Sequence, residues 1–227
     1  MIKFMEKLKS VITTDRDERS RVEGMKYFCI GLNKTGTTSL KKSFEDLDFV
    51  VGDQMAAEKL ADQYYFDGNF EPIISYCETA QVFQDIPFSW PETFKHLDQA
   101  FPDSKFILTV RDTPEQWYQS LVRFHSKSFG SQGGIPTAEE LRNVAYVNKG
   151  FVYRAVKVYG TLDDDLYNKD ALIAHYDQYN KSVLEYFRDR PDDLLVINLS
   201  EQDAYGRYCA FLGVEPLRDA FPWENKT

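Results

Sequence analysis

Cysteine is scarce in this chain of 227 residues. Three cysteines, Cys29, Cys77 and Cys209, are spread over the sequence, and no two of them form a Cys-x-x-Cys pair. So few and so scattered thiols exclude a disulfide framework. They predict a protein of a reducing compartment, which we take to be the cytoplasm.

Long apolar runs are also missing, and so is an excess of positive charge. No uninterrupted hydrophobic stretch reaches the length of a membrane span, and the N-terminus is broken by charges, so we expect residues 1–24 to be a solvated leader. The net charge of −9 disfavours a nucleic-acid partner. An anionic ligand is still compatible, because it needs only a few local cations and backbone N–H groups.

What the chain does contain fits a single domain over residues 25–227. Hydrophobic residues make up 43% of the sequence, enough for one sizeable core. Short apolar runs alternate with segments of helical spacing, which predicts an α/β fold of three layers with a mainly parallel central sheet flanked by helices. The predicted strands are Lys26–Leu32, Phe49–Gly52, Ala80–Phe88, Lys105–Val110 and Leu194–Leu199, and the predicted helices are Thr37–Leu47, Pro91–Ala100, Pro114–Phe124 and Lys169–Arg188.

Residues 124–166 depart from this alternation. They contain the sequence SFGSQGGIPT, two aromatic-rich segments and the acidic run Asp163–Asp165. Ligands of open α/β sheets bind at the carboxyl ends of the strands, so an insertion after the fourth strand predicts a helical cap over a substrate site. A flap that only shields the sheet is the alternative.

A glycine-containing loop, FCIGLNKTGTTSL, follows the first predicted strand. Its glycines, Gly31 and Gly36, allow backbone N–H groups to converge on an anion, and the helix that begins after them adds its positive end. The nucleotide-binding pattern GxxxxGK[ST] fits, except that Thr37 stands where the pattern requires lysine. The only lysine of the loop is Lys34. A simple strand-to-helix corner without a ligand is the alternative.

A second candidate phosphate site lies at the end of the fourth strand. The run KFILTV is followed by Arg111, and Ser120 comes nine residues later on the next predicted helix, so both side chains can converge on one phosphate. The alternatives are a surface salt bridge of Arg111 and a metal-binding strand end at Asp112. The missing loop lysine weakens the second of these.

Asp85 interrupts the apolar run AQVFQDIPF just before a proline. Carboxylates at such positions seldom occur without a partner or a role. Asp85 is therefore a candidate general base, with a strand-end cap or an ion pair with Lys34 as the structural alternative. Of the three histidines, His125 is kept as the other candidate base, because it lies one turn beyond Ser120 on the helix that leaves the site.

These motifs resemble the P-loop sulfotransferases, particularly the soluble bacterial and lower-eukaryotic type, in KTGTTSL, in D-x-P and in TVRD followed by a tryptophan. The resemblance extends from residue 26 to about residue 223. It implies a P-loop-type fold and an enzyme that moves a sulfonate group from 3′-phosphoadenosine 5′-phosphosulfate (PAPS) to a hydroxyl or amine by in-line displacement, without a metal. Adenosine 3′,5′-bisphosphate (PAP) is then the second product.

By the same resemblance, Lys34 contacts the bridging oxygen and the sulfonate, Asp85 takes the place of the general base, and Arg111 with Ser120 binds the 3′-phosphate. The catalytic residues are then Lys34 and Asp85. The implied donor-binding residues are Asn33, Lys34, Thr35, Gly36, Thr37, Thr38, Ser39, Arg111 and Ser120. The chain departs from hormone-type members at Phe83, where they carry a lysine, and it ends without their basic segment.

Two other functions stay open at this point: a divergent P-loop kinase or hydrolase, and a nucleotide-binding protein without turnover. The acceptor is predicted to be a small molecule, a glycan or a lipid alcohol. Its pocket is expected to involve residues 124–159, residues 64–70 and the C-terminal aromatic residues. The sequence fixes neither the acceptor nor the oligomeric state.

Overall fold

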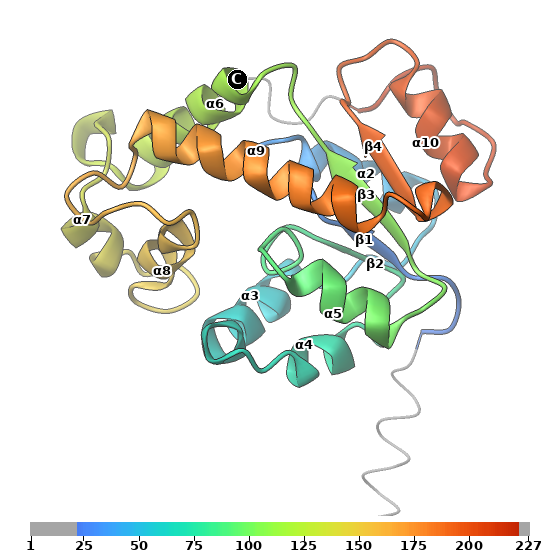
Figure 1. Cartoon of the computed structure of the whole chain (residues 1–227), viewed down its shortest axis with the longest axis horizontal. Helices are drawn as coiled ribbons and strands as arrows, with labels where there is room; N and C mark the ends of the chain where they lie inside the picture. The colour runs from blue at the N-terminus through green and yellow to red at the C-terminus, as the bar shows by residue number, and fades with distance from the viewer. Residues whose placement is uncertain (1–21, 223–227) are drawn as a thin grey trace, which may run out of the picture.

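The structure is a computed structural model that describes residues 22–222 (Figure 1). Most of the predicted leader, as well as residues 223–227, lies outside the described residues. A sheet of four parallel strands has the spatial order β2-β1-β3-β4. The strands are β1 (Tyr27–Cys29), β2 (Val82–Gln84), β3 (Lys105–Thr109) and β4 (Leu194–Ile197).

The helices surround this sheet. Four of them fall on predicted segments, and α6 continues beyond the predicted end at residue 124. Helices α7 and α8 lie in the segment predicted as a helical cap, and α3, α4 and α10 are not among the predicted helices. The bounds are α2 (Thr37–Asp46), α3 (Gln54–Tyr64), α4 (Glu71–Tyr76), α5 (Thr93–Ala100), α6 (Pro114–Phe129), α7 (Ala138–Asn143), α8 (Phe151–Lys157), α9 (Lys169–Tyr186) and α10 (Ala204–Leu212).

The predicted strand Phe49–Gly52 is wrong. Only Val51 pairs with the edge strand β2, through an isolated bridge to Val82. The chain then turns away at once, because Asp53 caps the N-terminus of α3 by accepting a hydrogen bond from the Ala56 N–H at 3.0 Å. Strands β1 and β2 are likewise shorter than predicted, since the buried apolar runs continue into the loops at their carboxyl ends.

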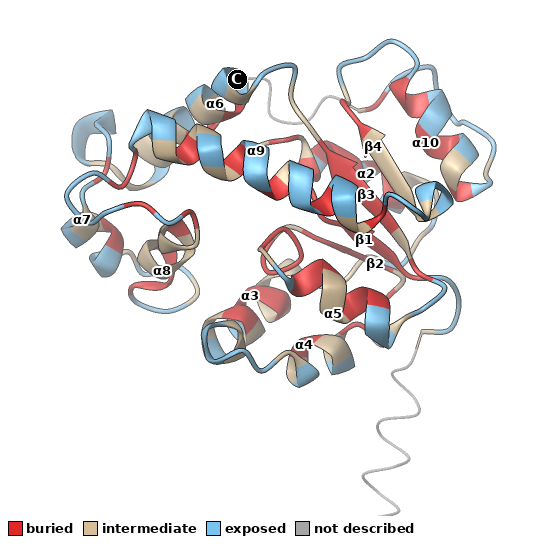
Figure 2. Cartoon of the chain, viewed as in Figure 1, coloured by how far each residue is buried: buried red, intermediate tan, exposed pale blue. Residues whose placement is uncertain are grey.

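Alternate strand residues enter two different cores, which gives the fold its three layers. Phe28 and Phe106 face the cluster under α5, α6 and α9, whereas Tyr27 and Ile107 face the cluster under α2 and α10. Strands β1, β2 and β3 are therefore buried on both faces, whereas β4 is mostly half-buried, as Figure 2 shows, and this explains their almost continuous apolar sequences. The predicted α/β fold with a parallel central sheet is confirmed.

Residues 124–166 form the end of α6, then α7 and α8, which lie beyond the sheet beside one end of α9 (Figure 1). Helix α7 begins with a complete capping box between Thr137 and Glu140. Arg154 of α8 donates a hydrogen bond from Nε to Asp62 of α3 at 2.8 Å, which ties this segment to a helix that precedes the edge strand β2. Within residues 22–222, no helix combines the length and the apolar character needed to cross a membrane.

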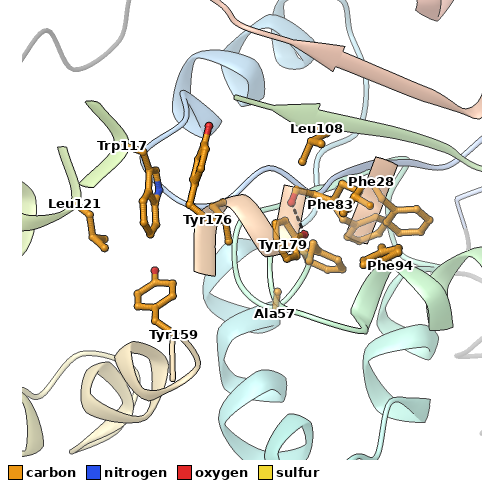
Figure 3. Close-up of a cluster of buried hydrophobic side chains, with 14 of the residues drawn as sticks. Phe28, Ala57, Phe83, Phe94, Leu108, Trp117, Leu121, Tyr159, Tyr176 and Tyr179 are labelled. Atoms are coloured by element: carbon orange, nitrogen blue, oxygen red, sulfur yellow. Dashed lines mark hydrogen bonds between the residues drawn. The ribbon is translucent and has the colours of Figure 1, made fainter. Parts of the chain in front are cut away.

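Aromatic residues of the core hold the carboxyl ends of the strands in place. Trp117 is fully buried between Tyr176 and Tyr159 (Figure 3), and its indole N–H donates to the backbone oxygen of Asn33 at 2.9 Å. The Arg111 N–H donates to the Tyr176 hydroxyl at 2.9 Å. Helices α6 and α9 thus fix the loop after β1 and the end of β3, the two segments that carry the candidate site.

Candidate functional site

The loop after β1 is locked against the end of β3. The Thr35 hydroxyl lies 2.5 Å from the Leu32 carbonyl and 2.5 Å from the Thr109 hydroxyl, and all of these atoms are buried. A Cβ on Gly31 would lie 2.0 Å from the Thr109 Oγ1, so only glycine fits there. The loop is therefore a preformed turn.

Helix α2 starts from this loop with an uncapped N-terminus. Gly36 takes the N-cap position with φ 108°, no side chain caps the helix, and its first turn has no acidic residue. The first N–H groups of a helix have no partner within the helix, so those of Thr37 and Thr38 can receive an anion. The φ of Gly36 strains any other residue at this position, and a Cβ there would also lie 2.6 Å from Leu199 Cδ1.

The residues expected to bind the donor and perform catalysis come together at this point, with the exception of Thr35. They surround a cavity of about 190 Å³, which we call the loop cavity. Two residues of α6, Phe124 and His125, complete its wall. The lining is Asn33, Lys34, Gly36, Thr37, Thr38, Ser39, Asp85, Arg111, Ser120, Phe124 and His125.

Thr35 differs from its neighbours. Its hydroxyl is used within the loop, and its N–H donates to Leu32 at 3.2 Å, so neither group is directed at a ligand. Thr35 instead borders a second cavity of about 330 Å³, the outer cavity, which also contains Arg111, Ser120 and Arg123. Arg123 has no role among the sequence predictions, although its position three residues after Ser120 places it on the same face of α6.

Lys34 is one of the two cations that line the loop cavity. Its φ of 72° lies in the left-handed region, and its ammonium group stands 3.9 Å from the centre of the Phe124 ring. Burial lowers the pKa of Lys34, the charge of Asp85 raises it in part, and the charge of Arg111 lowers it further. The Arg111 Nε donates to the Lys34 backbone oxygen at 2.7 Å, so the two cations are held side by side.

Asp85 also has a positive φ, 63°, at the end of β2. Its Oδ1 accepts hydrogen bonds from Asn33 Nδ2 at 2.8 Å and from the Ile86 N–H at 3.0 Å, and its Oδ2 accepts one from the Thr37 hydroxyl at 3.3 Å. Burial raises the pKa of Asp85, and the Ile86 N–H, the Thr37 hydroxyl and the Lys34 charge offset only part of that rise. Sparsely populated backbone conformations of this kind are often found at functional sites.

His125, the alternative base, has a different environment. Its Nδ1 lies 2.8 Å from the Tyr167 hydroxyl. Burial, together with the charge of Lys34, lowers the pKa of His125 to about 3. The imidazole is neutral near pH 7 and is a poor proton acceptor.

Both carboxylate oxygens of Asp112, the candidate metal ligand, accept hydrogen bonds from protein side chains. One oxygen accepts a hydrogen bond from Asn198, and the other accepts one from Gln116 Nε2 at 3.1 Å. Across residues 22–222, no group of three or more His, Cys, Asp or Glu side chains has the arrangement of a metal site.

Residues 26–227 match the family model of the sulfotransferase domain. The chain belongs to the sulfotransferase family. No curated protein matches it significantly. Membership establishes a transferase that moves sulfonate groups in general, and it agrees with the parallel α/β fold and with the loop after β1.

A third cavity of this sulfotransferase, about 360 Å³ in volume, adjoins the loop cavity, and we call it the acceptor cavity. Its lining is mostly apolar, and it shares Asn33, Asp85, Phe124 and His125 with the loop cavity. The remaining lining residues are Glu58, Ile86, Ser128, Phe129, Tyr146, Phe151, Val152, Ala155, Val156 and Tyr159.

Residues of the range 124–159 line this cavity, whereas residues 64–70 do not. Tyr65 and Phe66 stack on Trp90, and Phe70 stacks on His96, so these rings are used in packing. In their place α3 contributes Glu58. No sequence pattern indicated this residue, because α3 has no counterpart among the predicted elements.

Proposed function

We propose that this sulfotransferase moves a sulfonate group from PAPS to a hydroxyl or amine of a small-molecule acceptor. The observation that carries the proposal is the junction of two cavities of opposite character. The loop cavity holds Lys34, Arg111 and an uncapped helix N-terminus, whereas the acceptor cavity is apolar. Asp85 lines both of them, so an acceptor and an anionic donor would meet at its carboxylate.

The loop cavity suits the 5′-phosphosulfate end of the donor. The Thr37 and Thr38 N–H groups and the positive end of α2 would hold the 5′-phosphate. The ammonium group of Lys34 would lie near the bond that breaks. Its contact with the Phe124 ring shields it in part from bulk water, and a preorganised charge stabilises a developing anion more strongly where water is excluded.

The outer cavity suits a second phosphate. Arg111 and Ser120 line both the outer cavity and the loop cavity, and Arg123 adds a further cation to the outer one. A planar guanidinium forms strong charge-assisted hydrogen bonds with a phosphate dianion. This arrangement supports a donor with a 3′-phosphate in addition to its 5′-phosphosulfate group.

The proposed chemical step is a direct displacement at sulfur. Asp85 accepts the proton of the acceptor hydroxyl while the acceptor oxygen forms its bond to sulfur. The bond from sulfur to the 5′-phosphate oxygen breaks, and its electron pair stays on that oxygen, where the charge of Lys34 stabilises it. Adenosine 3′,5′-bisphosphate is released.

Asp85 is a better candidate for the base than His125. Its pKa is raised, whereas that of His125 is lowered to about 3, so the carboxylate is the group whose basicity its surroundings increase. Its hydrogen bonds to Asn33, Ile86 and Thr37 orient it between the two cavities. A group that is oriented and has raised basicity suits general base catalysis.

The two rival functions are less well supported. A kinase or hydrolase of the P-loop class requires the lysine that Thr37 replaces, and Asp112 already accepts two hydrogen bonds from protein side chains. A nucleotide-binding protein without turnover has no need for an oriented carboxylate between a cationic and an apolar cavity. The three free, buried cysteines support a cytoplasmic location.

Calorimetry and a transfer assay test the proposal. We expect purified protein to bind PAP without a metal, and to bind ATP with Mg²⁺ at least about tenfold more weakly, because ATP lacks the 3′-phosphate. Labelled donor should transfer its sulfonate to some member of a panel of phenols, alcohols and amines. Tight binding of Mg·ATP with weak binding of PAP would favour the kinase class, and PAP binding without any transfer would favour the binding protein.

A further inference from the structure

Glu58 is a buried carboxylate that faces the acceptor cavity and has no part in the chemical step above. Its side chain comes from α3 and the residue is only 5% exposed. One oxygen, Oε1, accepts a hydrogen bond from Gln54 Nε2 at 3.2 Å, and the other, Oε2, has no hydrogen-bond partner. Gln54 Nε2 also donates to the Ile86 carbonyl at 2.9 Å, so Glu58 is fixed relative to the strand end that carries Asp85.

The charge balance of the acceptor cavity is negative. Its lining contains two carboxylates, Glu58 and Asp85, and neither lysine nor arginine. The nearby Arg154 is paired with Asp62, and Lys34 lines the loop cavity only. His125 is neutral near pH 7 because burial lowers its pKa to about 3. A buried carboxylate without a counter-charge is costly, so a cation in the cavity would be favoured.

The pKa of Glu58 supports the same conclusion. Burial raises the pKa of Glu58 to about 7, the hydrogen bond from Gln54 and the nearby Tyr146 hydroxyl lower it in part, and the charge of Asp85 raises it. The side chain is thus only partly ionised near neutral pH, and a bound cation would shift it toward the carboxylate form. Tyr146 and Phe151 of the same lining present aromatic rings, which also attract ammonium groups.

We infer that the acceptor carries an amine at the end opposite its reacting hydroxyl, and that Glu58 binds the ammonium group through its unpartnered oxygen. The apolar body of such a molecule would fill the cavity between Glu58 and Asp85. Glu58 lines the acceptor cavity but not the loop cavity, which assigns it to substrate selection and leaves proton removal to Asp85. This inference rests on the proposed function, since it names the substrate class of the same site.

Two phenols of almost the same shape test the inference. Tyramine and 4-propylphenol share the reacting hydroxyl, and they differ only in an ammonium group that replaces a methyl group. With PAPS as donor, we expect wild-type protein to prefer tyramine by at least about tenfold in kcat/KM, with a matching difference in calorimetric affinity for the protein loaded with PAP.

The Glu58→Gln substitution keeps the size of the side chain and its contact with Gln54 but removes the charge. It should abolish the preference for tyramine, through KM rather than kcat, and should leave 4-propylphenol within about threefold of its wild-type value. Glu58→Asp, which keeps the charge, should retain part of the preference. Glu71→Gln, at an exposed position of α4, is the matched control and should change neither substrate.

The outcomes separate the inference from the proposed function. Equal use of both phenols by wild-type protein, or an equal loss for both in Glu58→Gln, would overturn the inference while sulfonate transfer stands. Failure to bind PAP and to modify either phenol would overturn the proposed function itself. If Glu58→Gln does not fold, the wild-type preference and its partial retention in Glu58→Asp still decide the matter.

Discussion

The loop cavity and the acceptor cavity share a wall but have opposite chemistry. The loop cavity has two cations, Lys34 and Arg111, and backbone N–H groups at the start of α2. The acceptor cavity has two carboxylates and no cationic side chain. Opposite charges so close together would neutralise each other if they formed direct ion pairs, yet within residues 22–222 no ion pair joins Lys34 to Asp85 or Glu58.

Phe124 and the hydrogen bonds of Asp85 keep the Lys34 ammonium group and the Asp85 carboxylate from forming an ion pair. The Phe124 ring takes the Lys34 ammonium group at 3.9 Å, and Asn33, Ile86 and Thr37 satisfy the Asp85 carboxylate. Each charge is therefore held by neutral groups and stays available to a ligand. A site built in this way can bind an anionic donor and a neutral or cationic acceptor at the same time.

Removing the proposed proton acceptor Asp85, which lines both cavities, should reduce the rate of sulfonate transfer more than any other change. Asp85→Asn keeps the size of the side chain and much of its hydrogen bonding, so donor binding should persist while transfer falls on the order of a thousandfold. The loss should be smaller with acidic phenols, which ionise without a base. Asp48→Asn is the matched control, because Asp48 also has a positive φ but is exposed. A variant that melts early and keeps its turnover per folded molecule would make Asp85 a structural cap.

Removing the charge of Lys34 from the loop cavity should have the next largest effect on the rate of sulfonate transfer. Lys34→Met keeps the apolar stem against Phe124 but removes the charge that faces the leaving oxygen, so transfer should slow about a hundredfold while PAP still binds. Single-turnover measurements at saturating donor isolate this step. Lys42→Ala, on the exposed face of α2, should behave as wild type. Unchanged single-turnover rates in Lys34→Met would remove Lys34 from the mechanism.

Arg111→Ala tests whether the outer cavity binds the 3′-phosphate of the donor. Loss of a charge-assisted contact should weaken PAP binding by about 2 kcal/mol, roughly thirtyfold. Adenosine 5′-monophosphate, which has no 3′-phosphate, should be affected much less, and calorimetry measures both ligands. Arg188→Ala, at an exposed position after α9, is the control. Equal weakening of both nucleotides would assign Arg111 to the fold of the loop, through its bond to Lys34, and not to the 3′-phosphate.

The smallest effect should be a pH dependence of stability. The pKa of His125 is lowered from 6.5 to about 3, so between these values the unfolded chain binds a proton that the folded protein does not. The contribution of neutral His125 to the free energy of unfolding is therefore fully present above pH 6.5 and is lost as the pH falls toward 3. In His125→Gln, the decrease in unfolding free energy from pH 7 to pH 5 should be smaller than in wild type by about 2 kcal/mol. Denaturant titrations at both pH values measure the two unfolding free energies. Equal decreases in wild type and in His125→Gln would show that His125 is exposed to solvent in the folded protein.

Much of the loop cavity could be predicted from the sequence because its residues are near neighbours along the chain. Gly36, Thr37 and Thr38 belong to one strand-to-helix turn, and such a turn creates an anion site through local backbone geometry alone. Arg111 and Asp85 were predictable for a related reason. Both stand at the carboxyl ends of parallel strands, and these ends meet at one edge of the sheet.

The acceptor cavity could be predicted only in part. Its aromatic side chains come from residues 124–159, the range that the break in the alternation of strands and helices singled out. Residues 64–70, which were also expected at the acceptor pocket, do not line this cavity, because those rings pack on Trp90 and His96. Glu58 was missed because the edge strand β2 pairs with only one residue of the segment before α3, and the chain turns there in a way that apolar patterning does not reveal.

The sequence by itself determined the parallel α/β fold, the turn that begins α2 and the strand ends that carry Asp85 and Arg111. These features depend on local backbone geometry and on the period of apolar residues, which are properties of short segments. Only the tertiary structure decided that α3 and α8 meet over Asp85, that Phe124 covers Lys34, and that Glu58 faces an apolar cavity. Those contacts join segments far apart in the chain, and the packing of whole helices sets them.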